Sequence, residues 1–300
     1  MTSLQSVASS AGVLRLGMFF GRRTPEGIGH RLAWWAAGVV CRLRPAVYNI
    51  VQSNLGQVLG PGASRRALDR ATRQVFYTAI RGYFDLFRAL QLTDGEISTL
   101  VDITEETRAA ARSLQDREGG VVLVFPHLSN FDLGGHALVP LLPEMQLFTV
   151  PDPPPGFQLL NESRRRSGIE VTPLSSSALR KAIKLLGRGG VVSLAGDRPV
   201  SDLDEPVSFF GRPARLPSGH IRLALKTGAT MMVAYCVLSP ETQRYAVHLE
   251  PPMDLIRTGN RDREVRLNMR RILDALEGII RRWPEQWQMF VPVWPELLGQ

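Results

Sequence analysis

The chain has few of the residues that mark several common kinds of site. Its 300 residues include only two cysteines, Cys41 and Cys236, which lie far apart, each at or next to a mostly apolar stretch. This usage predicts neither a disulfide framework nor a cysteine metal site, and it favours a reduced protein in the cytoplasm. The chain also has no Gly-x-Ser-x-Gly elbow and no Gly-x4-Gly-Lys loop. Their absence argues against a covalent serine hydrolase and against a nucleoside triphosphatase.

Long hydrophobic runs are also scarce. The apolar clusters from Val13 to Phe20 and from Leu32 to Cys41 are shorter than the roughly 20 residues that a membrane-spanning helix needs. Neither cluster resembles a secretory signal with a small-residue cleavage site. With 44% hydrophobic residues and no internal repeat, the chain can bury the core of one large domain or of two small ones.

Positive charge, by contrast, is plentiful. The formal net charge is +8, and arginine supplies nearly all of the basic residues, because the only lysines are Lys181, Lys184 and Lys226. Such a charge favours an anionic partner, which can be nucleic acid, an anionic membrane surface or a phosphorylated ligand.

The first 50 residues concentrate this charge. They hold six arginines (Arg15, Arg22, Arg23, Arg31, Arg42 and Arg44) against a single acidic residue, Glu26. Arginines beside Trp34, Trp35 and the Phe19-Phe20 pair suit a helix that lies in the membrane interface. The alternative is a pair of ordinary core helices with arginine-rich outer faces, and the sequence leaves both interpretations open.

The pattern of apolar residues changes near residue 119. Residues 1–118 are predicted to be mostly helical, and the amphipathic stripe in residues 65–90, with Ser64 as N-cap, predicts a core-facing helix. Strand and helix then alternate. The predicted strands are Val121–Phe125, Gln146–Val150, Ile169–Pro173, Val191–Ala195, Thr230–Leu238 and Arg244–Glu250. The predicted helices are Leu133–Leu141, Ser177–Leu186, Ser218–Thr227 and Asp262–Trp283.

This alternation predicts an α/β fold with a central, mostly parallel sheet and helices on both faces. The last two strands, joined by a turn at residues 239–242, are expected to form an antiparallel hairpin. The proline-rich stretch 151–156 cannot be helical and is expected to be a stiff surface loop near the site. We expect a helical N-terminal region (1–118) that packs on the α/β core (119–300), so that the chain forms one structural domain.

His127 is the most informative candidate for chemistry. It follows the short apolar run 121–125 and Pro126, so it is expected at the carboxyl end of a strand, where open α/β sheets place their ligands. Ser129 or Asn130 can cap the helix that follows. Asp132 lies in the first turn of that helix, close enough to fold back on the imidazole. A histidine oriented by a carboxylate is the minimal general base for activating a hydroxyl.

Two other segments bring polar groups to the same edge. The predicted strand 191–195 ends at Asp197 and Arg198, and polar ends of parallel strands tend to share one pocket; the alternative is a salt bridge within a loop. In residues 209–220, Gly211 and Pro213 predict a tight turn. Ser218 and Gly219 open a helix whose free N–H groups can bind a phosphate or an oxyanion. The positive charges that can assist are Arg212, Arg215 and the run Arg164-Arg165-Arg166, which can equally be a solvated basic turn.

Two further interpretations stay open from the residues alone. His127, Asp132 and His136 form a His-x4-Asp-x3-His pattern that suggests a metal, but no Cys or Glu cluster completes the site. No metal is therefore assigned. The second alternative is a non-catalytic protein that binds an anionic membrane or nucleic acid through its arginines. Nucleic acid is not expected, because the chain lacks the interleaved aromatic residues of a stacking groove.

Four motifs together resemble those of glycerolipid acyltransferases, the lysophospholipid acyltransferase-like superfamily. They lie, in order, at residues 127–132, 189–198, 209–219 and 284–287. The likeness spans residues 30–295 and is strongest to the bacterial lipid A biosynthesis acyltransferases and the related phosphatidylinositol mannoside acyltransferases. Asp-Arg-Pro at 197–199 and Ala-Arg-Leu-Pro-Ser-Gly at 214–219 look more like the mannoside branch, although Phe131 stands where those enzymes carry Trp.

The resemblance implies an α/β sheet with a helical N-terminal region at the membrane, and it implies a mechanism. His127 would take the proton from an acceptor hydroxyl as the oxygen attacks an acyl thioester, with Asp132 holding the imidazole. Asp197, with Arg198, matches a family position that lines the acceptor site. The residues assigned to phosphate groups of donor or lipid are Arg164, Arg212 and Arg215, next to the helix start at Ser218 and Gly219.

The same resemblance implies the partners. Acyl-CoA or acyl carrier protein would supply the acyl group as a co-substrate, with no bound cofactor and no acyl-enzyme. The acceptor would be a lipid or glycolipid of the phosphatidylinositol mannoside type, or alternatively a lipid A precursor or a lysophospholipid. The protein would work as a peripheral or monotopic protein at an anionic membrane surface, on the cytoplasmic face of the cell inner membrane.

Overall fold

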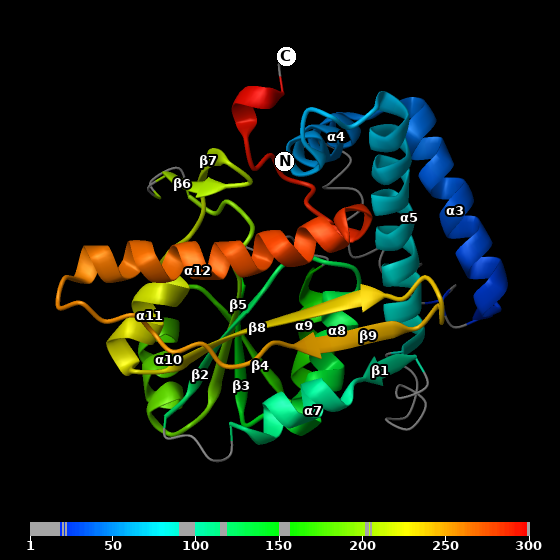
Figure 1. Ribbon diagram of the computed structural model, residues 1–300. Helices are drawn as coiled ribbons and strands as arrows, with labels where there is room; N and C mark the ends of the chain where they lie inside the picture. Colours follow the sequence, from blue (N-terminus) through cyan, green and yellow to red (C-terminus); the bar gives the residue numbers. More distant parts are fainter. Residues whose placement is uncertain are drawn as a thin grey trace.

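A seven-stranded sheet lies at the centre of the part of the chain that the structure describes (Figure 1). The structure is a computed structural model that describes residues 19, 21, 23–89, 100–114, 119–149, 157–201, 204 and 206–298. The predicted loop at 151–156, and all of the apolar cluster 13–20 except Phe19, lie outside these residues. The strand order is β1-β9-β8-β2-β5-β3-β4.

Most neighbouring strands of this sheet are parallel. The pairs β2–β8, β2–β5, β5–β3, β3–β4 and β1–β9 are parallel, and only β8–β9 is antiparallel. The predicted parallel sheet and the predicted final hairpin are therefore confirmed. The strand bounds are β1 Val101–Ile103, β2 Val121–Phe125, β3 Met145–Thr149, β4 Ile169–Pro173, β5 Val191–Ala195, β8 Thr230–Leu238 and β9 Tyr245–Leu249.

Helices cover both faces of the sheet, as the alternation predicted. Along β2, Val122 and Val124 face a core shared with three helices, α10 (Ser176–Gly187), α11 (Gly219–Thr227) and α12 (Arg261–Arg282). The alternate residues, Val121 and Leu123, face a second core shared with α7 (Glu105–Arg112), α8 (Phe131–Leu138) and α9 (Phe157–Arg166). Because successive side chains of a strand point to opposite faces, a fully apolar run such as 121–124 is what a strand between two helical layers requires.

A small hairpin corrects the turn expected around Gly211 and Pro213. Strands β6 (Pro206–Phe209) and β7 (Arg212–Arg215) pair antiparallel, and Pro213 lies inside β7 opposite Ser208. The turn residues are Phe210 and Gly211, both with positive φ, at 51° and 76°. Two positive φ values in a two-residue loop suit the twist of a hairpin. Glu277 on α12 holds the strained Phe210 by accepting its backbone N–H at 2.9 Å.

Three helices form a layer beside the sheet (Figure 1). They are α3 (Glu26–Leu43), α4 (Ala46–Leu59) and α5 (Arg65–Ala89), the last capped by Ser64 as predicted, since its Oγ accepts from the N–H of Ala67. Helix α3 packs closely on α5: a Cβ on Gly29 would lie 2.1 Å from the ring of Phe84. Arg81 of α5 donates to the side chain of Gln243 beyond β8, which fastens this layer to the sheet.

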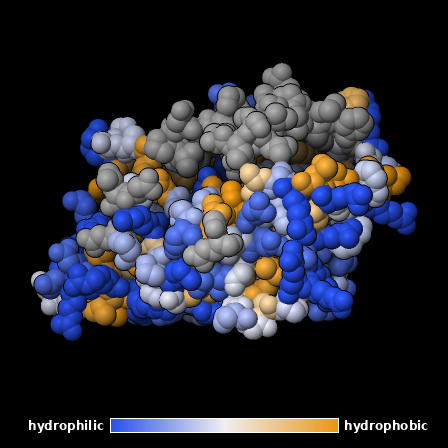
Figure 2. Space-filling view, turned by 90° about the horizontal axis from the view of Figure 1, so that it is seen from above, coloured by the Kyte–Doolittle hydropathy of each residue, from blue (hydrophilic) through white to orange (hydrophobic). Residues whose placement is uncertain are grey.

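The two faces of α3 differ in an unusual way. The face against α5 buries small residues, Gly29, Ala33 and Ala37. The opposite face exposes large apolar side chains, with Trp35 73% and Leu43 74% exposed. This outer stripe consists of Ile28, Leu32, Trp35, Val39 and Leu43. In Figure 2, hydrophobic surface appears on the right-hand side, where Figure 1 places α3. None of the helices in the described residues is long and apolar enough to cross a bilayer.

Candidate active site

The candidate site forms where two neighbouring parallel strands end. Phe125, the last residue of β2, is paired with Ala195, the last residue of β5. Two residues beyond each of them lie His127 and Asp197. Because the strands are parallel and in register at their ends, these two side chains arrive at the same level of the carboxyl edge. A Cβ on Gly196 would lie 2.6 Å from Val124, so the step between Ala195 and Asp197 requires a glycine.

His127 and Asp197 are joined by two hydrogen bonds. The ring nitrogen Nδ1 of His127 lies 2.8 Å from Oδ1 of Asp197, and the backbone N–H of His127 donates to Oδ2 at 2.8 Å. An ionised carboxylate only accepts, so Nδ1 carries the proton and Nε2 keeps its lone pair. No hydrogen bond to Nε2 forms within the described parts of the chain. Nε2 is therefore the atom that can take a proton from a substrate.

Asp197 is fully buried but well provided with donors. Its side chain is 0% exposed, and the indole Nε1–H of Trp287 donates to Oδ2 at 2.8 Å. Burial alone would raise the pKa of the Asp197 carboxyl, but the His127 ring and the hydrogen bonds from His127 and Trp287 outweigh it and hold this pKa below its ordinary value. Asp197 is thus ionised at neutral pH and stabilises an imidazolium at His127.

Asp132 occupies a different position from the one expected. Its carboxylate binds Arg164 of α9, at 2.7 Å from Nε and 2.6 Å from Nη2, and its side chain is only 11% exposed. The expected contact with His127 is made by Asp197 instead. The physical reason is register: Asp197 lies level with His127 on the neighbouring strand, whereas Asp132 lies within the first turn of α8, facing α9. Asn161 also accepts from Arg164, at 2.8 Å.

Backbone contacts hold the segment that carries His127. Leu128 forms a bridge with Trp287, and the carbonyl of His127 accepts the N–H of Gln288 at 2.8 Å. Ser129 has a φ of 47°, and its N–H donates to the carbonyl of Gln286 at 2.8 Å. The motif at 284–287, to which the sequence attached no role, therefore acts as a brace for the histidine and its carboxylate.

The helix after His127 begins as one of the two predicted alternatives. Asn130 is the N-cap of α8: its Oδ1 accepts the N–H of Leu133 at 3.2 Å, while its Nδ2 donates to the carbonyl of Gly82 on α5 at 3.0 Å. Phe131 packs edge-to-face on the His127 ring, with centroids 5.3 Å apart. These contacts fix the imidazole plane before any substrate binds.

Arg198 lies beside Asp197, and Tyr83 lies near Arg198. Arg198 is half-buried, and burial lowers its pKa although Asp197 and Tyr83 act in the opposite direction. It forms no ion pair within the described part of the chain, and its role in binding the acceptor stays a prediction. Tyr83 of α5 lies within electrostatic reach of Asp132, Arg164 and Arg198. Nothing in its amphipathic helix distinguished Tyr83 from a surface residue.

The other predicted binding residues lie apart from His127. Arg212 contacts Gln57 and Glu296, and the guanidinium of Arg215 donates to the carbonyl of Asp204. Ser218 and Gly219 do start α11, and Ser218 accepts from Arg222. No hydrogen bond or ion pair between described residues joins these four to His127 or Asp197. Their assignment to phosphate groups stays a prediction.

The three residues of the alternative metal pattern have separate partners. His136 contacts the hydroxyls of Ser163 and Ser167 on and after α9, while Asp132 binds Arg164 and His127 binds Asp197. Within the described residues, no group of three His, Cys, Asp or Glu side chains is placed to hold a metal ion.

The fold and this geometry together define an enzyme of the α/β class with a carboxylate-bound histidine at the carboxyl edge of its sheet. The family model of the bacterial lipid A biosynthesis acyltransferases matches residues 5–296. The chain therefore belongs to this family and is an acyltransferase, which confirms the resemblance drawn from the four motifs.

Three curated relatives are similar over most of their length, and all are phosphatidylinositol mannoside acyltransferases. Those of Mycobacterium tuberculosis, strains CDC 1551 / Oshkosh and H37Rv, are 27% and 28% identical over 260 and 261 residues, each covering 81% of this chain and 76% of the relative. That of Mycolicibacterium smegmatis is 26% identical over 279 residues, covering 91% of this chain and 87% of the relative.

Proposed function

We propose that the protein moves a fatty acyl group from an acyl thioester, acyl-CoA or acyl carrier protein, to a hydroxyl of a phosphatidylinositol mannoside-type glycolipid. The observation that carries the proposal is the His127–Asp197 pair, whose Nδ1–carboxylate contact at 2.8 Å leaves Nε2 as a base. The names of the three relatives support the choice of acceptor. A lipid A precursor or a lysophospholipid is the alternative acceptor, since the family model covers the lipid A enzymes.

In the proposed reaction, Nε2 of His127 takes the proton of the acceptor hydroxyl while its oxygen attacks the thioester carbonyl. The tetrahedral intermediate collapses, the C–S bond breaks, and the imidazolium returns the proton to the leaving thiolate. The products are an ester and a free thiol, so no acyl-enzyme forms. Asp197 holds the Nδ1–H tautomer and stabilises the imidazolium. A general base positioned in this way raises the rate roughly 10²–10⁴-fold.

The surface of α3 supports catalysis at a membrane. Its outer stripe places five large apolar side chains in solvent, and arginines flank it, as in helices that lie in the membrane interface. An ordinary core helix would bury such residues, so the alternative of core helices with basic outer faces fits α3 less well. A net charge of +8 adds attraction to an anionic bilayer.

The decisive variant is His127→Gln, which removes the base but keeps a polar side chain of similar reach. We expect the rate of acyl transfer from acyl-CoA to a phosphatidylinositol mannoside acceptor to fall roughly 10²–10⁴-fold. The protein should stay folded, because Trp287 and the backbone N–H of residue 127 still donate to Asp197. The control is His248→Gln, which alters a histidine stacked on Tyr235 at 4.6 Å, outside the site. Full activity in His127→Gln would remove His127 as the base.

The acceptor is tested separately with wild-type protein. Transfer of a labelled acyl group is compared among a phosphatidylinositol mannoside, a lipid A precursor and a lysophospholipid, with acyl-CoA and acyl carrier protein as donors. Preferential acylation of the mannoside supports the proposed acceptor. Preference for either of the other lipids would contradict it while leaving the acyltransferase chemistry intact.

A further inference from the structure

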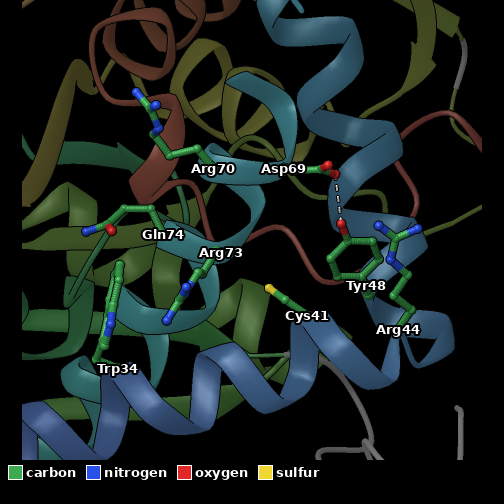
Figure 3. A pocket seen from close by; sticks show the side chains of 8 residues that line it. All are labelled: Trp34, Cys41, Arg44, Tyr48, Asp69, Arg70, Arg73 and Gln74. Carbon is green, nitrogen blue, oxygen red and sulfur yellow. Dashed lines mark hydrogen bonds between the residues drawn. The ribbon is translucent and has the colours of Figure 1, made fainter. Parts of the chain in front are cut away.

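A charged cavity lies between the three N-terminal helices, apart from the catalytic pair. It has a volume of about 580 Å³, within the range of small-molecule sites. Figure 3 shows the side chains that line it: Trp34, Cys41, Arg44, Tyr48, Asp69, Arg70, Arg73 and Gln74. Arg73 and the site residue Tyr83 are ten positions apart on α5, about 15 Å along the helix axis. The cavity is therefore separate from the catalytic pair.

The cavity carries an excess of positive charge. The lining includes three arginines, Arg44, Arg70 and Arg73, and one carboxylate, Asp69, and none of the three arginines forms an ion pair within the described residues. Asp69 instead accepts from two neutral donors: the Tyr48 hydroxyl at 3.1 Å, drawn in Figure 3, and the Gln52 amide at 2.8 Å. Asp69 is thus bound by Tyr48 and Gln52, and the charges of the three arginines are left without a paired carboxylate in the cavity.

Aromatic rings hold two of these arginines while leaving their hydrogen-bond donors available. Arg73 lies over the Trp34 ring at 4.0 Å, and Arg44 lies over the Tyr48 ring at 5.3 Å. A guanidinium held by its flat face keeps its N–H groups directed outward in its own plane, where they match the oxygens of a phosphate. The Nε of Arg73 is buried and has no hydrogen-bond partner. A buried guanidinium donor without a protein partner can donate to an acceptor that a ligand brings.

The position of the cavity indicates the source of the phosphate. Trp34 and Cys41 belong to α3, and Arg44 follows directly after Leu43, the last member of the exposed apolar stripe. A lipid whose acyl chains lie against that stripe would have its phosphate at the level of Arg44. A free phosphate ion would make no use of the stripe.

We propose that this cavity binds the phosphate headgroup of an anionic glycerophospholipid of the bilayer, and so anchors the helical layer at a fixed depth while the sheet edge acts on its acceptor. This proposal rests on the membrane association proposed above. It adds a lipid site that is distinct from the acceptor and donor positions around His127.

The chain offers its own reporter for this site. Cys41 lines the cavity and is half-buried, whereas Cys236 is 2% exposed and burial raises its pKa to about 12, so a maleimide reacts with Cys41 alone. The full-length protein is alkylated in the presence of water-soluble dihexanoyl phosphatidylglycerol. We expect the lipid to slow Cys41 alkylation at least threefold, and the Arg73→Gln variant to need about tenfold more lipid for the same protection.

The matched control is Arg66→Gln, which removes the same charge from an exposed position on the same helix. Arg66→Gln should keep the wild-type protection. An equal loss of Cys41 protection in both variants, or no protection in the wild-type protein, would overturn the proposed headgroup site. Protection by inorganic phosphate or by dihexanoyl phosphatidylcholine at the same concentration as phosphatidylglycerol would overturn its selectivity for an anionic lipid. If Arg73→Gln fails to fold, Arg70→Gln replaces it, because Arg70 is exposed and has no structural contact among the described residues.

Two other variants separate this proposal from the proposed function. His127→Gln should lose acyl transfer and keep full lipid protection of Cys41. The pair Leu32→Ser and Trp35→Ser should lose binding to phosphatidylglycerol vesicles, yet keep protection by the short-chain lipid, whose tails need little of the stripe. The pair Leu174→Ser and Leu179→Ser, which changes exposed apolar residues outside α3, is the control for the vesicle experiment. If protection fails while vesicle binding and acyl transfer persist, the headgroup site alone is wrong.

Discussion

The carboxyl edge of the sheet and the cavity between α3, α4 and α5 both gather charged side chains, but they leave them in opposite states. At the sheet edge each carboxylate has a cationic or hydrogen-bonding partner: Asp197 has His127, and Asp132 has Arg164. In the cavity, Arg70 and Arg73 have no counter-ion among the described residues. At the sheet edge the carboxylates are paired within the protein, whereas in the cavity these arginines are not.

This difference indicates that the sheet edge positions catalytic groups, whereas the cavity suits the binding of an anion. A buried charge whose partners are already in place does not reorganise when the reaction begins, and such preorganisation is a large source of catalytic rate. An uncompensated cation is instead ready for a ligand that brings the opposite charge. The same criterion singles out Arg198 at the active site, because it lies beside the complete pair and has no ion pair within the described chain.

The largest expected effect is that of Asp197→Asn at the carboxyl edge of the sheet. The amide cannot stabilise an imidazolium, so we expect kcat to fall roughly 10²–10⁴-fold while KM changes little. Since the folded pKa of Asp197 lies below its ordinary value of 3.8, its contribution to stability is present above about pH 4 and is lost as the pH falls further. Asp197→Asn should therefore flatten the loss of stability below that pH. Steady-state kinetics and acid-unfolding curves measure the two effects.

The control for Asp197→Asn is Asp274→Asn, which breaks an exposed ion pair with Arg270 on α12. It should change neither kcat nor the acid transition. A kcat for Asp197→Asn within threefold of wild type would show that the His127–Asp197 contact does not serve the reaction.

Asp132→Asn tests the ion pair between Asp132 and Arg164. It shows whether Asp132, unlike Asp197, contributes to stability rather than to catalysis. Arg164 is nearly buried, with 8% of its side chain exposed, so removing its partner leaves an uncompensated charge and should cost about 3 kcal/mol of unfolding free energy. A double-mutant cycle with Arg164→Gln measures the coupling by chemical denaturation. Coupling near zero would contradict a structural role. A loss of kcat with unchanged stability would instead show that Asp132 serves the reaction.

Much of the sheet and of its carboxyl edge could be predicted, because both depend on local sequence patterns. The mostly apolar runs at 121–125, 191–195 and 230–238 predicted strands with the observed bounds, since strands inside a parallel sheet are buried on both faces. The edge strand 169–173 was predicted from its alternating pattern, in which Ile169 and Val171 are buried. Their common carboxyl edge placed His127 and Asp197 in one pocket. Choosing between Asp132 and Asp197 as the partner required the register of β2 against β5, which no local pattern records.

Other features were missed for a similar reason. The strand β1 is three residues long and gains its stability from β9, far along the chain. Trp287 looks like any buried tryptophan until its indole is found against Asp197. Tyr83 and the cavity arginines lie on helices whose sequence shows only amphipathic periodicity. Contacts between distant segments decide these positions, and such contacts are invisible to periodicity and spacing.

The smallest expected effect concerns a buried group that lacks partners, as Asp197 would without its donors. His220 on α11 is 1% exposed, and its Nε2 has no hydrogen bond. Burial lowers its pKa from 6.5 to about 4. The folded protein therefore keeps His220 neutral, while the unfolded chain takes up a proton as the pH falls below 6.5. Stability is therefore lost as the pH falls from 6.5 to about 4.

Replacing His220 with leucine removes both the titration and the unpartnered nitrogen. We expect His220→Leu to match or exceed wild-type stability at pH 7, where the buried imidazole contributes no hydrogen bond through Nε2. Between pH 6.5 and 4 its unfolding free energy should fall less steeply than that of wild type, as measured by urea denaturation at several pH values. Parallel curves for the two proteins would mean that His220 is hydrogen-bonded or solvated in the folded state. The acid sensitivity would then have to come from other buried groups, such as His136, whose pKa burial also lowers.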